Sequence, residues 1–346
     1  MNKQHIQDLM KKVYQWQHTN RTRFVIRSTG KKRFLRATDW ERGVFWLSVA
    51  DAWKETNDQD YLDGLMDYTL NTGFRPGHLP RFADDHVCIQ AYLPLYPLMD
   101  TPEIIEYATN AFDIMTNDPK NGRNDWWWCD SLFMAPPAFA GISAITGDKK
   151  YIDYMDTAFW DAVDNLYDPE TGLYYRDHRY IPNDEQTELR EKNGEKIFWS
   201  RGVGWVLTAI PRILEHMPQD YPTRGQYIAM FTALAEEVIK YQQEDGFWRT
   251  SLLDPENYPS PESSATSLFV CGLAWGVEKG LLDKSIYLPI ITKSWEALKT
   301  CVHDNGMIGW VQLPAYNPRD VEFEHNIDYG AGAFLLAATQ VMKILK

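Results

Sequence analysis

Three consecutive tryptophans, Trp126 to Trp128, stand just before an aspartate, Asp130, at the predicted start of a short helix. A carboxyl group packed against indole rings loses hydration, which disfavours its charged form and raises its pKa. Proteins use this effect to keep a carboxylic acid protonated near neutral pH, ready to donate a proton. Flat aromatic faces also suit the rings of a sugar. The competing interpretation is that Asp130 only caps the next helix, since Asp is a favoured N-cap residue.

A second acidic pair, Asp84 and Asp85, is followed directly by His86. Protonation of a carbon atom needs a strong and well-placed acid, and a neighbouring carboxylate would help to keep that acid protonated. We expect Asp85 to be this neighbour of Asp130. The alternative is that the pair caps a helix beginning near Val87. Asp84 receives no role of its own.

An arginine lies between two tryptophans in the segment Trp199-Ser200-Arg201-Gly202-Val203-Gly204-Trp205. A guanidinium group can pair with a carboxylate, and glycines allow a ligand or a backbone to come close. We therefore expect Arg201 to bind an anionic sugar between the walls formed by Trp199 and Trp205. The alternative is a cation–π sandwich that joins two helices.

The composition excludes several classes of function. A net charge of −13 argues against nucleic acid, which calls for a basic surface. The densest basic region, residues 21–36, is predicted to be a solvated loop and helix end. The four cysteines form no C-x-x-C pair, and the acidic clusters at 84–86 and 322–325 lack the spacing of metal ligands. We expect no metal, no other cofactor, and a small anionic ligand as the partner.

The whole chain, residues 1–346, is predicted to be a single domain, because no low-complexity or charged linker divides it. Its first residues have the pattern of an amphipathic helix and lack the apolar core of a signal peptide. No apolar run approaches the roughly 18 residues of a membrane span. The sequence therefore predicts a cytoplasmic protein without a membrane partner, and it leaves the oligomeric state open.

Two local patterns recur along the chain. In residues 52–63, 144–153 and 276–285, an apolar helix ends at a polar turn and an aspartate begins the next helix. In residues 168–175 and 244–248, and again at 304–310, an acidic turn with glycine leads into a short extended piece. Repeated helical hairpins of roughly 50–60 residues give about six units in a closed ring. We expect an all-α fold, a double ring of six inner and six outer helices, with an aromatic-rich cleft on one face.

Five separated motifs together resemble glycoside hydrolase family 105, which comprises unsaturated rhamnogalacturonyl hydrolases and related unsaturated glucuronyl hydrolases. The resemblance extends from about Trp40 to the C-terminus. The motifs are Asp84-Asp85-His86, Trp126-Trp127-Trp128-Cys129-Asp130-Ser131-Leu132-Phe133-Met134, Phe198 to Trp205, Asp245-Gly246-Phe247-Trp248-Arg249 with Pro261-Glu262-Ser263-Ser264, and Asp328-Tyr329-Gly330-Ala331-Gly332.

This resemblance implies an (α/α)6 barrel of six helical hairpins and an unusual reaction. The family hydrates the 4,5 double bond that polysaccharide lyases leave in a non-reducing-end uronic acid, and the hydrated sugar then collapses to a keto acid. By resemblance, Asp130 protonates C4 and then serves as base for the water that adds at C5, with Asp85 as the second functional aspartate. The substrate-binding residues implied are Arg201, Trp199, Trp205, Arg176, His86, Trp128 and Trp40.

The sequence departs from the family near Arg176, where some relatives have a histidine. Arg176 could replace that histidine as a carboxylate partner, and the roles of Asp177 and His178 stay open. The leading substrate is an unsaturated galacturonyl-rhamnose disaccharide from rhamnogalacturonan, and other unsaturated glucuronyl oligosaccharides are the close alternative. Further alternatives are an inverting glycosidase, a sugar isomerase and a non-catalytic sugar-binding protein on the same barrel.

Overall fold

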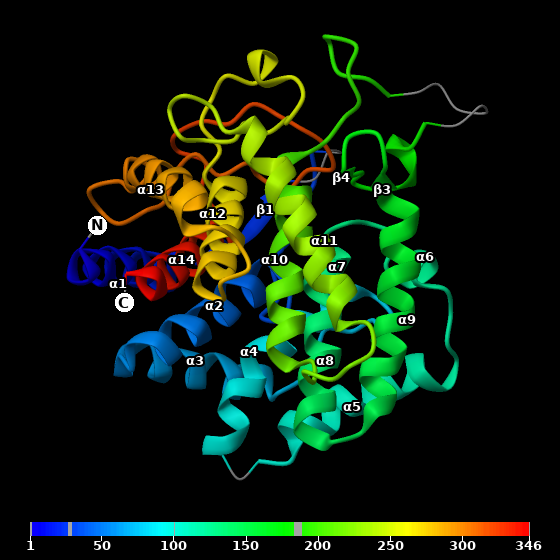
Figure 1. Ribbon diagram of the computed structural model, residues 1–346. Coiled ribbons are helices and arrows are strands. Elements are labelled where there is room, and N and C mark those ends of the chain that lie inside the picture. Colours follow the sequence, from blue (N-terminus) through cyan, green and yellow to red (C-terminus); the bar gives the residue numbers. More distant parts are fainter. Residues whose placement is uncertain (1, 27–29, 100, 183–188, 346) are drawn as a thin grey trace.

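The computed structural model describes residues 2–26, 30–99, 101–182 and 189–345, and helices arranged in two rings dominate them (Figure 1). The predicted all-α barrel is confirmed. Each inner helix packs against the next one, and the last returns to the first. The inner helices are α2 (Trp40–Thr56), α4 (Ile89–Tyr92), α8 (Pro136–Thr146), α10 (Ser200–His216), α12 (Ser263–Glu278) and α14 (Asp328–Ile344). The outer helices are α1 (Lys3–Thr19), α3 (Gln59–Thr72), α5 (Glu103–Asn117), α9 (Lys149–Leu166), α11 (Arg224–Val238) and α13 (Lys284–Lys299).

The predicted helix-turn-helix repeats form three of the hairpins. Asp58, Asp148 and Asp283 are the N-cap residues of α3, α9 and α13. Each side chain accepts a hydrogen bond from the backbone N–H two residues ahead, which satisfies a donor that the helix itself cannot. The preceding helices α2 and α8 end at residues in the left-handed conformation, Asn57 and Gly147. This local chemistry makes inner and outer helices antiparallel neighbours.

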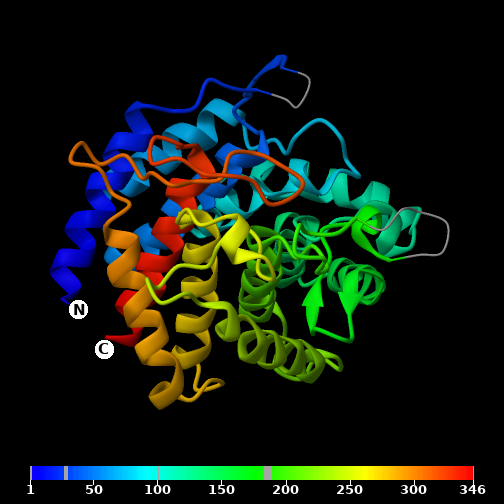
Figure 2. The same ribbon diagram turned by 90° about the horizontal axis from the view of Figure 1, so that it is seen from above.

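The first and the last described helices close the ring. α1 packs along α14, and both figures place the two chain ends on the same side of the molecule (Figure 1, Figure 2). The side-chain amide of Gln17 donates to Asp328 Oδ1 at 2.6 Å, and the backbone N–H of Thr22 donates to the same oxygen at 2.9 Å. Both Gln17 and Asp328 are buried. A polar contact between distant parts of the chain therefore fixes the register of this pair.

The second inner position departs from the expected regular hairpins. α4 has only four residues and continues into the 3-10 helix η2 (Leu93–Leu98). Pro94 and Pro97 lie in this continuation. Since proline has no N–H to donate and clashes with the preceding turn, it prevents a regular α-helix here.

The remaining elements are short. The basic segment 21–36, predicted to be a loop and helix end, instead contains an antiparallel hairpin in which Val25 pairs with Arg33. The other small sheet follows α9 at one of the predicted acidic turns, where Gly172 has a positive φ of 72°. The short elements are β1 (Phe24–Ile26), β2 (Lys32–Phe34), β3 (Tyr167–Asp168), β4 (Leu173–Tyr174), α6 (Gly122–Asp125), α7 (Ser131–Met134), η1 (Ala83–His86), η3 (His178–Tyr180), η4 (Ile239–Tyr241) and η5 (Pro255–Asn257).

The inner helices α2, α10, α12 and α14 all begin at one end of the barrel, which we call the N-terminal face. The segments that lead into α10, α12 and α14 gather at this end, at the top of Figure 1. Three of the motifs found in the sequence, at residues 198–205, 261–264 and 328–332, lie at the starts of α10, α12 and α14. No helix in the described ranges is long and apolar enough to cross a membrane.

Gly202 brings α10 close to the segment that carries Asp130. A Cβ atom at Gly202 would lie 2.7 Å from Cys129 Sγ and 2.9 Å from the Trp199 ring. We expect Gly202→Ala to destabilise the fold by about 1–3 kcal/mol and to lower the melting temperature by several degrees. Gly225→Ala is the matched control, because no heavy atom lies within 4 Å of its added Cβ. An equal loss of stability in both variants would contradict the proposed close contact.

Candidate active site

Asp130 lies at the N-terminal face with its carboxylate free of any capping role. It is the N-cap residue of α7, but its side chain makes no capping hydrogen bond. The carboxylate is 8% exposed and lies 3.4 Å from the Cys129 thiol, which donates to it. Asp130 Oδ2 also lies 3.7 Å from Nε of Arg176. The capping interpretation is therefore wrong, and the carboxylate faces a guanidinium group.

The three preceding tryptophans do not form one aromatic wall around Asp130. Trp126 is buried in the core, where its ring contacts Phe139 edge-on. Trp127 lies 5.5 Å from the Arg176 guanidinium, and Trp128 stacks against Phe82. Indole rings thus support the arginine and the neighbouring loop, so the expected contact between indole and carboxylate is replaced by an ionic one.

Arg176 is held beside Asp130 by backbone and side-chain bonds. The Cys129 N–H donates to the Arg176 carbonyl at 2.9 Å, which joins the two segments. The buried Asp177 carboxylate accepts from Arg176 Nη1 at 2.6 Å and from Arg179 Nη2 at 2.7 Å. The Nε of Arg176 is buried without a hydrogen-bond partner. His178, by contrast, is exposed. Of the candidates left open in this segment, Arg176 is therefore the one that faces Asp130.

Asp84, rather than Asp85, is the aspartate whose pKa is affected by the charge of Asp130. Burial raises the pKa of Asp84 well above its usual range, and the negative charge of Asp130 is the next largest cause. One Asp84 oxygen, Oδ1, is buried without a hydrogen-bond partner. Asp85 instead accepts a hydrogen bond from the Leu79 N–H at 2.7 Å and lies against Gly77. The Asp85 carboxylate therefore has a backbone partner in the loop, and Asp84 is the aspartate of η1 that is influenced by the charge of Asp130.

Glu41 is a further acidic residue of the site that the sequence analysis missed. It lies in the first turn of α2, is fully buried, and contributes to the raised pKa of Asp84. Its carboxylate is contacted by Arg33 of β2, while Oε2 has no hydrogen-bond partner. Burial raises the pKa of Glu41 to about 7, although the Arg33 charge opposes this shift. An acidic residue at a helix start is common, so its type and position carried no signal.

The raised pKa of Glu41 predicts a pH-dependent contribution to stability. Below pH 4.5 the group is protonated in both folded and unfolded chains, and between 4.5 and about 7 only the folded chain retains the proton. The free energy of unfolding therefore falls as pH rises through this window. We expect Glu41→Gln to raise the melting temperature more at pH 8 than at pH 5. A constant difference across this range would contradict an ionising buried Glu41.

Arg201 and its neighbours organise a loop beside the acidic cluster. The guanidinium lies between the rings of Trp199 and Tyr329, at 4.5 and 4.8 Å from their centroids. Arg201 Nη1 donates to the Gln312 carbonyl at 2.5 Å, and Tyr329 also donates to that oxygen. The buried Glu262 carboxylate accepts from the Gln312 N–H at 3.0 Å. The sandwich considered as an alternative is present, and it fixes the loop that follows residue 310.

The other predicted binding residues divide between the site and the core. Trp40 stacks on Tyr329 at 4.7 Å and is partly exposed, so it lies beside Arg201. Trp205 and His86 are fully buried. Trp205 contacts Phe133, and the His86 ring packs against aromatic residues while its Nε2 meets the Pro80 carbonyl. Burial lowers the pKa of His86 to about 4, which keeps the ring neutral. These two residues support the site from the core.

Helix starts add a favourable electrostatic field at the N-terminal face. α2, α10 and α14 begin there without a side-chain cap hydrogen bond. The unpaired N–H groups and aligned peptide dipoles of a helix start carry partial positive charge and attract anions. Arg176 and Arg201 add full charges at the same end. An acidic protein can therefore still bind a small anion at this face.

The chemistry available at the site is that of carboxylates and guanidinium groups. Within the described ranges, His, Cys, Asp and Glu form no group of three or more that could hold a metal ion. Burial raises the pKa of the nearest thiol, Cys129, well above its usual range, with the Asp130 charge as the next cause. Cys129 is therefore protonated and is a poor nucleophile. Proton transfer by Asp84 and Asp130 is the chemistry that this arrangement supports.

A double ring of helices with carboxylates, guanidinium groups and indole rings at one end is typical of helical-barrel enzymes that act on carbohydrates. The chain is 35% identical over 323 residues to an unsaturated 3S-rhamnoglycuronyl hydrolase from Formosa agariphila, covering 90% of this chain and 86% of that one. A protein of the same name from an Alteromonas species is 37% identical over 330 residues, covering 88% and 77%.

Solved structures agree with these relatives. A glycosyl hydrolase family 88 protein from Bacteroides vulgatus superimposes with a TM-score of 0.88 at 29% identity, covering 99% of both chains. A structure described as a polysaccharide lyase has a TM-score of 0.87 at 30% identity, covering 99% of this chain and 98% of that one. A family model described as Glycosyl Hydrolase Family 88 matches residues 9–345. The chain belongs to glycosyl hydrolase family 88, and the resemblance indicated by its motifs is confirmed.

Proposed function

We propose that this protein is an unsaturated uronyl hydrolase, which adds water across the 4,5 double bond of a non-reducing-end unsaturated uronic acid and so releases the attached sugar. The observation that carries the proposal is the contact between Asp130 and Arg176, with Asp84 near enough for the charge of Asp130 to raise its pKa. An acid pair beside a buried guanidinium suits a substrate that is an anion and must be protonated.

The environment of Asp84 favours its protonated form. Burial, and next the negative charge of Asp130, raise the pKa of Asp84 well above its usual range. A substrate carboxylate that pairs with Arg176 would draw this arginine away from Asp130. Asp130, released from this ion pair, is assigned as the acid.

The reaction then needs one water molecule and no other reactant. Asp130 donates its proton to C4, and the developing positive charge is shared by C5 and the ring oxygen. The Asp130 carboxylate next takes a proton from water as the water oxygen bonds to C5. The resulting hemiketal opens to a ketone at C5, and the hemiacetal at C1 collapses to an aldehyde and the free aglycone alcohol. Asp130 ends protonated, as it began.

The proposed aglycone is rhamnose. The two relatives described above carry names with a rhamnoglycuronyl group, and another relative, 24% identical, is an unsaturated rhamnogalacturonyl hydrolase of Bacillus subtilis. The lyase reaction makes C4 and C5 trigonal, so galacturonate and glucuronate yield the same unsaturated sugar. The choice between them therefore reduces to the anomeric linkage and the aglycone. Unsaturated galacturonyl-rhamnose from rhamnogalacturonan is the leading substrate.

Absorbance near 235 nm tests the proposed reaction directly, because the conjugated unsaturated uronate absorbs there. The protein would be incubated with lyase-generated disaccharides from rhamnogalacturonan and, separately, from glucuronate-containing glycans. We expect the absorbance to fall on a rhamnose-linked substrate. An absorbance that instead rises on intact polysaccharide would identify a lyase, the activity named for one structural relative. Hydrolysis of saturated glycosides alone would identify an ordinary glycosidase.

Arg176 is proposed to bind the uronate carboxylate. Arg176→Lys keeps the positive charge but loses the planar, two-pronged donor geometry. We expect KM to rise about 10–100-fold, the effect of losing a charged hydrogen bond, with a smaller change in kcat. His178→Ala is the control, because the exposed ring should leave both constants within about twofold. A larger effect in His178→Ala than in Arg176→Lys would exchange the two assignments.

A further inference from the structure

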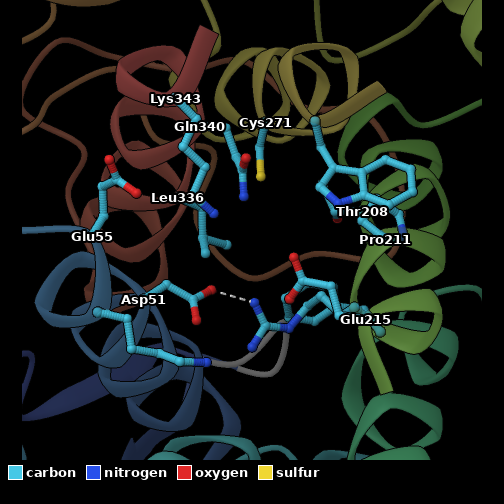
Figure 3. Close-up of a pocket in the computed structure, with 13 residues that line it drawn as sticks. Asp51, Glu55, Thr208, Pro211, Glu215, Cys271, Leu336, Gln340 and Lys343 are labelled. Carbon is cyan, nitrogen blue, oxygen red and sulfur yellow. Dashed lines mark hydrogen bonds and ion pairs between the residues drawn. The ribbon is translucent and has the colours of Figure 1, made fainter. Parts of the chain in front are cut away.

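A cavity of about 200 Å³ lies at the end of the barrel opposite the proposed active site (Figure 3). The same helices that begin at the N-terminal face contribute their C-terminal halves to its walls. Asp51 comes from α2, Arg212 from α10, Trp275 from α12 and Gln340 from α14. None of the residues assigned to the proposed active site lines this cavity, which we call the C-terminal cavity, so it is a separate site.

The charged groups around the C-terminal cavity balance one another. Three acidic residues and three basic residues line it, and Asp51 Oδ2 lies 2.6 Å from Arg212 Nη1. The side chains of Lys54, Glu215 and Lys343 form no hydrogen bond or salt bridge within the described ranges, and all three line the cavity. A wall with equal numbers of both signs favours neither an anion nor a cation.

Two buried polar groups in the same wall lack a hydrogen-bond partner. Gln340 is 8% exposed and its Oε1 accepts nothing, while Trp275 is 3% exposed and its indole N–H donates to nothing. A buried polar atom without a partner is unfavourable, and such atoms are rare in folded proteins. A hydroxyl group supplies both missing partners, because it can accept from the indole and donate to the amide oxygen.

The rest of the wall suits the carbon skeleton of a small polyol. Phe133, Pro211 and Leu336 present apolar surface, and burial raises the pKa of Cys271 to about 12, so its thiol stays uncharged. We propose that the C-terminal cavity binds a small neutral polyhydroxylated molecule of about monosaccharide size. This site is additional to the proposed active site and does not depend on the reaction assigned there.

A ligand bound in the C-terminal cavity would affect the proposed active site through α7. Phe133 lines the cavity and lies three residues after Asp130. Gln90 donates to the Phe133 carbonyl at 2.8 Å and accepts from Arg212 Nε at 2.7 Å, so it connects the cavity wall to α7. α7 therefore connects the cavity wall, through Phe133, to Asp130 at its N-terminus.

Isothermal titration calorimetry of the full chain with L-rhamnose tests the proposal, with D-glucosamine as a charged probe that lacks the carboxylate proposed to bind Arg176. We expect rhamnose to bind and D-glucosamine to bind at least about tenfold more weakly. Gln340→Met and Trp275→Phe each remove one orphaned group with little change in shape, so each should weaken rhamnose binding about tenfold. The melting temperature of each variant shows whether it folds. One folded variant, Gln340→Met or Trp275→Phe, is enough for the test.

Arg176→Lys, at the other end of the barrel, is the matched control and should leave the rhamnose affinity unchanged. Three outcomes would overturn the proposal: no heat with rhamnose, tighter binding of D-glucosamine than of rhamnose, or unchanged rhamnose binding in both cavity variants. Binding lost only in Arg176→Lys would place the sugar at the active site instead.

Discussion

Replacement of Asp130 by asparagine is expected to lower kcat about 10³-fold or more while the substrate still binds. The amide cannot deliver the proton to C4 and cannot accept one from water, so both proton transfers are lost, and each typically contributes 10²–10⁴-fold. The carboxylate makes no capping hydrogen bond, so the fold should tolerate the change. The rate of absorbance loss near 235 nm measures kcat, and calorimetry with the unsaturated disaccharide measures binding.

The two readouts separate the possible roles of Asp130. A non-catalytic sugar-binding protein would show binding but no activity in either the original or the variant. Activity retained within tenfold in Asp130→Asn would exclude this residue as the acid. The melting temperature is the control, and we expect it to change by only a few degrees.

Asp84→Asn and Asp85→Asn form a matched pair that decides which aspartate assists Asp130. We expect Asp84→Asn to lower kcat by about 10²–10³-fold, because it removes the buried carboxyl group whose raised pKa depends partly on the charge of Asp130. Asp85→Asn should keep kcat within about threefold, since its amide oxygen can still accept from the Leu79 N–H. The same 235 nm assay measures both variants.

The pH dependence of the Asp84→Asn variant provides an independent readout. Burial and the negative charge of Asp130 raise the pKa of Asp84, so removal of the Asp84 carboxyl group should change the pH profile of kcat/KM. The reverse ranking of the two variants, with Asp85→Asn the more damaged, would restore Asp85 to the role first expected for it.

The helical barrel could be predicted because its local signals agree with its tertiary structure. Asp58, Asp148 and Asp283 are N-caps in the sequence pattern and in the structure. The irregular second inner position was harder to predict, because its length depends on packing around Pro94 and Pro97. The hairpin of β1 and β2 was missed as well, since strands of three residues leave almost no periodicity.

The site could be predicted in its components but not in its pairings. Asp130 and Arg201 were found from their aromatic neighbours, and both lie at the N-terminal face. The choice between Asp84 and Asp85 depends on the direction of each side chain in one 3-10 turn, which sequence spacing does not specify. Glu41 is part of the cluster only because α2 begins there, and Arg33 reaches it from a separate hairpin. Such contacts between distant segments are set by tertiary packing.

The pairing of α1 with α14 also has a kinetic consequence. Gln17 and Asp328 are 311 residues apart in sequence, so this contact has a very large loop-closure cost and contributes to a high contact order. Hairpins such as α8 with α9 involve only local contacts and can form early. Because Glu41, Asp130 and Tyr329 come from different hairpins, a partly assembled ring holds the pieces of the site without its geometry. Recovery of activity during refolding would therefore report the closure of the ring rather than the formation of its helices.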